Sequence, residues 1–209
     1  MNKENLKPNV DKVELWLFVS MMLVATMIVL GGATRLTNSG LSITEWAPIK
    51  GMLPPLNNQA WLIEFEKYKL IPEFLAEHSD MDLAGFKVIY FWEWSHRQLG
   101  RIIGLVYAIP LLYFIISNKI QKGKLINFLA ILFLICTQGF IGWWMVSSGL
   151  INDRVDVSQY RLATHLGVAF VILACLFWLW RNQRESWPDN SGNKNLIWLT
   201  SILSLLVYL

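Results

Sequence analysis

The sequence predicts an all-α, polytopic membrane protein. Of its 209 residues, 55% are hydrophobic and only 16% are charged, whereas a soluble domain carries about 25% charged residues. The charges are also segregated, because long runs contain none. We expect a four-helix transmembrane bundle, the start of a fifth helix, and a long external loop that contains an amphipathic helix. The net charge of +3 is too small to indicate a nucleic acid as partner.

Uncharged runs locate the transmembrane helices. A helix needs about 20 apolar residues to cross the hydrocarbon core, where its backbone groups must be satisfied internally. The runs without Asp, Glu, Lys or Arg are 15–34, 102–118, 125–152 and 162–180. We therefore expect spans at 15–34, 93–118, 125–146 and 161–180. The apolar residues 196–209 predict the start of a fifth span in a truncated second bundle, so we expect the chain to be a fragment of a longer protein.

Lysine and arginine residues set the expected orientation. They concentrate in residues 1–14, 119–124 and 181–195, and short loops rich in these residues remain in the cytoplasm. The N-terminus is then cytoplasmic, and segments 35–92 and 147–160 are external. The first helix is longer than the apolar region of a typical cleavable signal peptide.

The external segment 35–92 is too long to be a simple connection. It contains an amphipathic stretch at residues 61–74. Loops of this length are usually lids or binding loops. The alternative is an interfacial helix that lies on the membrane surface.

Two of the three histidines are candidate ligands. His96 and His165 lie near the external ends of two predicted spans. An ionisable residue at membrane depth normally faces the bundle interior and is functional. The alternative is an interfacial histidine that hydrogen-bonds a headgroup or a backbone carbonyl. We expect His78, which lies in the long loop, to be solvated.

The number of available ligands favours haem over other metal centres. Zinc sites use three or four protein ligands, and carboxylate-bridged di-iron sites need several Glu residues from the bundle helices. Haem needs one or two axial ligands, which two facing helices can supply. We therefore predict that His96 and His165 are axial ligands of a haem iron.

The neighbours of the two histidines fit a haem. Gly100 and Gly104 follow His96 at helical spacing, which gives a shallow face for a porphyrin or, alternatively, a helix-packing face. Arginines near the external ends could pair with haem propionates or reach toward the interface instead. These arginines are Arg97, Arg101 and Arg161.

Glu93 is the candidate catalytic residue. It precedes His96 by three residues, so the two share a face if the helix extends that far. In a low-dielectric pocket a carboxylate could act as a base or stabilise a cationic intermediate. The alternative is a carboxylate at a helix start that complements the macrodipole.

Several long motifs together resemble the haem A synthase family over most of the chain up to about residue 180. They are Gly31-Gly32-Ala33-Thr34-Arg35-Leu36-Thr37, Ser39-Gly40-Leu41-Ser42, Trp46 with Pro48 and Gly51, Pro54-Pro55-Leu56, Phe86-Lys87-Val88-Ile89-Tyr90-Phe91-Trp92-Glu93-Trp94-Ser95-His96-Arg97, Gln138-Gly139, Gly142-Trp143-Trp144-Met145-Val146 and Ser158-Gln159-Tyr160-Arg161-Leu162-Ala163-Thr164-His165-Leu166. The long loop has no cysteine pair, which is similar to the proteobacterial and mitochondrial branch.

The resemblance implies an activity, a fold and a location. Such enzymes oxidise the C8 methyl of haem O to a formyl group, which gives haem A for cytochrome oxidase. The family fold has eight transmembrane helices in two bundles, each with a histidine pair. The first pair, which matches His96 and His165, is taken as the substrate site, with Glu93 as the functional residue beside it. The second pair, beyond this chain, holds haem b.

The resemblance also implies a bacterial inner membrane protein. Its expected partners are haem O, haem A, the lipid bilayer, haem O synthase and cytochrome oxidase assembly factors. Two other classes remain open. One is a b-type cytochrome that passes electrons to a quinone, and the other is a non-enzymatic subunit that handles haem during assembly.

Overall fold

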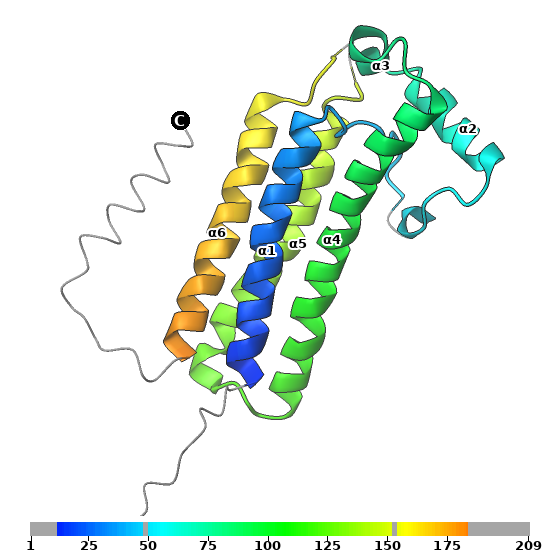
Figure 1. The fold of residues 1–209 in the computed structure, drawn as a ribbon. Helices are drawn as coiled ribbons and strands as arrows, with labels where there is room; N and C mark the ends of the chain where they lie inside the picture. The colour runs from blue at the N-terminus through cyan, green and yellow to red at the C-terminus, as the bar shows by residue number, and fades with distance from the viewer. Residues whose placement is uncertain (1–11, 48–49, 152–153, 184–209) are drawn as a thin grey trace, which may run out of the picture.

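The computed structural model describes residues 12–47, 50–151 and 154–183, and these residues form helices joined by loops. Four of the helices are long and apolar enough to cross a membrane. They are α1 (Lys12–Leu36), α4 (Leu83–Ile116), α5 (Leu125–Ser147) and α6 (Gln159–Gln183). Figure 1 shows them side by side as one bundle. The predicted all-α architecture of a polytopic membrane protein is confirmed, and the predicted fifth helix at 196–209 lies outside the described residues.

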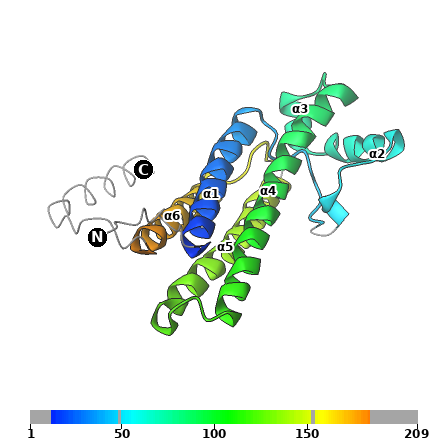
Figure 2. The same cartoon turned by 60° about the horizontal axis from the view of Figure 1, so that its bottom comes forward.

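The long helices form a ring in which α4 and α6 stand across from each other. α1 packs against both α4 and α6, and α5 also packs against both of them. The two views in Figures 1 and 2 agree with this order. A side chain on the inner face of α4 can therefore meet one on the inner face of α6 only at the centre of the bundle.

At the end of the bundle where α4 connects to α5, the core is rich in aromatic side chains. The Trp16 ring of α1 stacks on Phe128 of α5 with 5.9 Å between ring centroids, and its Nε1 donates to the carbonyl of Val106 at 2.8 Å. Tyr107 is fully buried and donates from its hydroxyl to the carbonyl of Phe128 at 3.0 Å. These paired polar groups satisfy aromatic side chains that would otherwise bury an unbonded donor.

The connection between α1 and α4 folds into a separate unit at the opposite end of the bundle (Figure 1). It contains the short helix η1 (Lys50–Met52), α2 (Asn58–Tyr68) and α3 (Pro72–Glu77). The helix α2 starts at Asn57, whose side chain accepts from the Ala60 N–H at 2.8 Å. A second hydrophobic cluster, which includes Trp61, Phe65, Tyr68, Phe74 and Phe86, holds this unit on the first turns of α4.

Two features differ from the sequence-based expectations. The amphipathic stretch 61–74 is not one helix, because Pro72 begins α3 and the preceding Ile71 is extended, as a residue before proline prefers. The helix α4 begins at Leu83, well before residue 93, with the Asp82 side chain capping the N–H of Gly85. The level at which α4 enters the membrane stays a prediction, as do the other span boundaries.

Candidate functional site

His96 and His165 lie on opposite helices of the bundle. His96 lies on α4 and His165 on α6, the two helices that stand across from each other in the ring. The Nδ1 atoms of both are buried and have no hydrogen-bond partner among the described residues. The pairing of the two histidines as ligands stays a prediction.

Each histidine ring lies against a glycine of a neighbouring helix. A Cβ atom added to Gly31 of α1 would lie 3.0 Å from Cε1 of His96. A Cβ atom added to Gly142 of α5 would lie at the same distance, 3.0 Å, from Cε1 of His165. Such contacts are tighter than most real Cβ contacts, so a side chain at either glycine would require the ring to shift by a few tenths of an ångström. The two helix pairs, α1 with α4 and α5 with α6, therefore repeat one arrangement.

Gln138 supports the second of these arrangements. Its Nε2 donates to the backbone carbonyl of His165 at 2.9 Å, while its Oε1 is buried without a partner in the described part of the chain. The carbonyl of a helical residue is normally taken by the N–H four residues later, so this bond adds a second donor from α5. It fixes the backbone that carries the His165 ring.

Glu93 is buried and accepts hydrogen bonds at both carboxylate oxygens. Its Oε2 accepts from the Ser42 hydroxyl at 2.8 Å and from the Ile43 N–H at 2.7 Å. Its Oε1 accepts from Nε and Nη2 of Arg97 at 3.0 and 2.5 Å. Every partner is a donor, which suits an ionised carboxylate, because that form accepts at both oxygens and has no proton of its own to place. The site is built to hold an anion.

This environment excludes the helix-start interpretation of Glu93. The helix α4 begins at Leu83 and is capped by Asp82, so Glu93 lies in the interior of the helix. Macrodipole effects fall off within the first turn. Glu93 and His96 also lie on one continuous helix, as the predicted shared face requires.

Arg97 links Glu93 to the segment that joins α1 and α4. Besides Glu93, its Nη2 donates to the carbonyl of Ile43 at 2.9 Å and its Nη1 to that of Glu45 at 3.2 Å. Its guanidinium also lies 5.8 Å from the centroid of Trp46. With these partners Arg97 positions Glu93 and the loop above it. The Arg97 guanidinium therefore has few N–H donors left for the predicted contact with a haem propionate.

The other predicted binding residues differ in what they contact. Arg101 has a buried Nη1 without a partner among the described residues, which leaves it free to bind an anion. Arg161 donates to the carbonyl of Trp144 at 2.7 Å and lies over its ring at 4.5 Å. Gly100 faces Met27 of α1, and no atom lies within 4 Å of a Cβ added to Gly104. Their roles in haem binding stay predictions.

Several residues around the site were not singled out by sequence reasoning. Ser42 and Ile43 donate hydrogen bonds to Glu93. Gly31 and Gly142 pack against the two histidine rings of the site. Tyr68 hydrogen-bonds His78. Gly31, Ser42 and Gly142 all occur in the motifs listed above, but a motif does not show which atoms meet. His78 is not simply solvated as expected, because its Nδ1 lies 2.6 Å from the Tyr68 hydroxyl.

The donor set fits a haem between the histidines better than a bare metal ion. Among the described residues no group of three or more His, Cys, Asp or Glu side chains could hold a metal ion. Two imidazoles on helices that stand across the ring from each other could supply the one or two axial ligands that haem needs. Their unpartnered Nδ1 atoms and the glycines behind them show that packing sets the orientation of the rings.

The chain is similar to proteins of known family over most of its length. The family model described as "Cytochrome oxidase assembly protein" matches residues 14–209. A protein named heme A synthase from Beijerinckia indica is 50% identical over 197 residues, which are 93% of this chain and 55% of that protein. The heme A synthase of Paracoccus denitrificans is 54% identical over 166 residues, which are 79% of this chain and 44% of that protein.

A third relative agrees with these two. The heme A synthase of Maricaulis maris is 51% identical over 176 residues, which are 84% of this chain and 51% of that protein. The chain spans about half the length of the curated relatives it matches. No solved structure matches it. Since the family model covers nearly the whole chain, the chain belongs to the cytochrome oxidase assembly protein family.

Proposed function

We propose that the full-length protein is a haem A synthase, which oxidises the C8 methyl of haem O to a formyl group. One observation carries this proposal. A buried, hydrogen-bonded carboxylate, Glu93, lies one helical turn before His96 on α4, the helix that stands across the ring from the helix of His165. A site that only binds haem needs the two imidazoles but has no use for a buried anion beside them. The relatives named heme A synthase support the same function.

The residues of this chain divide the work among them. His96 and His165 hold the substrate haem through its iron, and Arg101 supplies an unpartnered donor for one of its anionic propionates. Removing two electrons and a proton from the methyl group leaves a cation-like carbon. Glu93 stabilises that positive charge, and water adds to give the alcohol. A second oxidation gives a gem-diol, which loses water to become the aldehyde.

Arg97 keeps Glu93 ready for this role. A carboxylate without fixed partners would lose part of its effect by turning toward water. Here the guanidinium lies on Oε1 and the Ser42 and Ile43 donors lie on Oε2. The carboxylate is thus fixed before the charge develops, which is the condition for effective electrostatic stabilisation.

We also propose the predicted arrangement in the bacterial inner membrane. The N-terminus is cytoplasmic, and the unit between α1 and α4 is external, on the same side as the connection from α5 to α6. The lysines of the α4–α5 connection support this orientation. Haem b in the second half of the protein, and contacts with haem O synthase or assembly factors, are part of the proposal.

Haem analysis of membranes that contain the full-length protein tests the function. We expect haem O to be converted to a hydroxymethyl and then a formyl product, and we expect the conversion to depend on Glu93. Membranes that hold only haem b, with haem O left unchanged, would indicate the b-type cytochrome instead. Haem transfer to an oxidase without any change in the haem would indicate the assembly subunit.

A further inference from the structure

Glu73 is a second buried carboxyl group, and the proposed chemistry does not use it. Glu73 and Glu93 are the only buried acidic residues among the residues described, with 4% and 3% of their surfaces exposed. Glu73 lies on α3, in the unit between α1 and α4, and Glu93 lies on α4. Ser42 and Ile43 of the same α1–α4 connection donate to Glu93, so both buried carboxyl groups are bound by this unit.

Glu73 begins a short chain of hydrogen-bonding groups that ends at the surface. The Tyr68 hydroxyl lies 3.4 Å from Oε2 of Glu73 and 2.6 Å from Nδ1 of His78. Tyr68 is completely buried, whereas His78 is partly exposed. A buried carboxyl group is thus connected through one phenol to an imidazole that water can reach.

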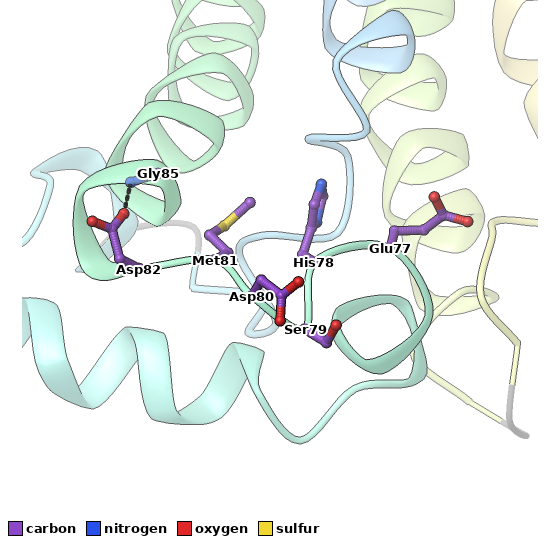
Figure 3. A pocket seen from close by; sticks show the side chains of 7 residues that line it. All are labelled: Glu77, His78, Ser79, Asp80, Met81, Asp82 and Gly85. Carbon is purple, nitrogen blue, oxygen red and sulfur yellow. Dashed lines mark hydrogen bonds between the residues drawn. The ribbon is translucent and has the colours of Figure 1, made fainter.

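His78 lies at the edge of an acidic pocket. It lines an open pocket of about 460 Å³ together with Glu77, Asp80 and Asp82. Figure 3 shows these side chains around the loop between α3 and α4, with the His78 ring directed toward the bundle. Carboxylates at such a mouth attract protons from solution because they make the local potential negative.

The protonation states of these groups allow a proton to pass. Burial, and then the charges of Glu93 and Asp156, raise the pKa of Glu73 to about 8, although Tyr68 and Arg35 partly oppose this rise. Glu73 therefore carries a proton at neutral pH, and in that state Oε2 can donate to the Tyr68 oxygen instead of accepting from the Tyr68 hydroxyl. Burial lowers the pKa of His78, against the opposing effect of Glu77. The neutral imidazole can then accept at Nδ1 the hydrogen bond that Tyr68 donates.

We propose that Glu73, Tyr68 and His78 conduct protons between the Glu93 pocket and the water outside the α1–α4 unit. This inference rests on the proposed function, because that reaction must dispose of protons. Converting R–CH3 and water to R–CH2OH releases two protons and two electrons, and the step to the aldehyde releases two of each again. The electrons pass to a protein-bound redox cofactor, and the protons leave through Glu73, Tyr68 and His78 to solution.

Infrared spectroscopy of the full-length protein tests the path without any turnover. A protonated carboxyl group has a C=O band that shifts when its hydrogen is replaced by deuterium. We expect this band at neutral pH in the wild type and in Glu66→Gln, and we expect it to be absent from Glu73→Gln. Glu66 is a matched control because it lies in the same unit but is exposed and pairs with Lys69.

The rate of the shift after mixing with D2O then reports how fast protons reach Glu73. Tyr68→Phe keeps the ring that packs against Phe74 and Phe86 and removes only the hydroxyl group. We expect deuterium to reach the Glu73 carboxyl group roughly tenfold more slowly, or slower still, in this variant. That factor is smaller than the full contribution of a positioned proton-transfer group. Exchange as fast as in the wild type would show that protons reach Glu73 by another route and would overturn the proposal.

Conversion of haem O tests whether the path serves the reaction. We expect Tyr68→Phe and Glu73→Gln to keep the haem spectrum but to convert haem O about tenfold more slowly, with a larger solvent deuterium isotope effect than Glu66→Gln. Conversion at the wild-type rate in both variants would overturn the proposal. A wild-type protein that converts no haem O would instead refute the proposed function, on which the exchange measurement does not depend.

Discussion

Gly31 of α1 and His96 of α4 are in such close contact that a methyl group added to Gly31 would require the ring to shift. A Cβ atom on Gly31 would lie 3.0 Å from Cε1 of the ring, whereas one on the adjacent Gly32 would have no atom within 4 Å. The position of the ring is therefore set by the absence of a side chain on another helix. The same relationship between Gly142 and His165 places the second ring.

We predict that Gly31→Ala lowers haem occupancy of the site. The added methyl group must push the imidazole aside, because both backbones belong to long helices, and overpacking of this kind costs about 1–3 kcal/mol. Haem per protein and the low-spin absorption spectrum measure the effect. Gly32→Ala is the matched control, and it should leave both unchanged. Equal occupancy in the two variants would show that the Gly31 contact does not position His96.

The sequence is sufficient to predict the bundle but not the contacts that form the site. Apolar runs of the right length specify helices such as α1 and α6, because an uncharged segment in lipid has few alternatives to a helix. The pairing of His96 with His165 follows in turn from their matched positions. Gly31 could not be assigned to His96 in this way, because a glycine in an apolar helix fits many packing roles.

The unit between α1 and α4 was the least predictable part. Its local signals are sound, as Pro72 at the start of α3 shows, but its tertiary contacts join residues far apart in sequence. Ser42 and Ile43 bind a carboxylate about 50 residues later, and no periodicity encodes such a contact. Arg97 was expected at a propionate because its position fits one, and only the structure shows that Glu93 and the loop carbonyls occupy it.

We predict that His96→Ala and His165→Ala each prevent stable occupancy of this haem site. Each substitution removes one of two facing imidazoles, and among the described residues no further cluster of metal-binding side chains could replace it. The measurement is the low-spin spectrum of the full-length protein in which the C-terminal histidine pair has also been substituted. An unchanged spectrum in both variants would refute the ligand assignment.

We predict that the α1–α4 unit becomes less stable as the pH rises, and that Glu73→Gln removes this dependence. The pKa of Glu73 is raised from 4.5 to about 8 in the folded protein, chiefly by burial. In the folded state Glu73 therefore keeps its proton up to a higher pH than it does in the unfolded state. Below about pH 4.5 there is no effect, and between 4.5 and 8 stability falls by about 1.4 kcal/mol per pH unit. Above about pH 8 the loss is constant.

Amide hydrogen exchange in α2 and α3, measured across this pH range, tests the prediction. Local opening free energies can be corrected for the intrinsic effect of pH on exchange. Glu66→Gln is the control, because Glu66 pairs with Lys69 on the exposed side of α2. If Glu73→Gln and wild type show the same pH dependence, Glu73 does not hold a proton in the folded protein.

We predict that residues 119–124 are cytoplasmic and that the α1–α4 unit is periplasmic. Lys119, Lys122 and Lys124 lie at the turn between α4 and α5, and translocating a lysine-rich short loop is unfavourable. Fusions of a reporter that is active only in the periplasm, placed after Lys124 and in the loop before α2, measure the orientation. Activity after Lys124 together with inactivity in the loop would reverse it.

We predict that Glu93→Gln retains haem but loses most formyl production. The substitution removes the negative charge, and losing one such electrostatic contact typically costs about 2.7–4 kcal/mol, roughly a hundred- to thousand-fold in rate. It also places an amide group opposite either Arg97 or the Ser42 and Ile43 donors, which leaves one set without an acceptor. The ratio of haem A to haem O, normalised to haem-loaded protein, measures the chemical step apart from this structural cost.

Ser42→Ala separates the charge of Glu93 from its hydrogen bonding. This variant removes the donor that lies 2.8 Å from Oε2 but leaves the carboxylate, the Ile43 N–H and Arg97 in place. A hydrogen bond to a charged group contributes about 1.5–3 kcal/mol, and part of that loss falls on stability rather than on the reaction. If the charge acts on the reacting methyl group, Ser42→Ala must therefore be much more active than Glu93→Gln. Equal losses in the two variants would mean that Glu93 only holds the loop against α4, and a ratio within about twofold of wild type in Glu93→Gln would leave the proposed reaction without its stabilising anion.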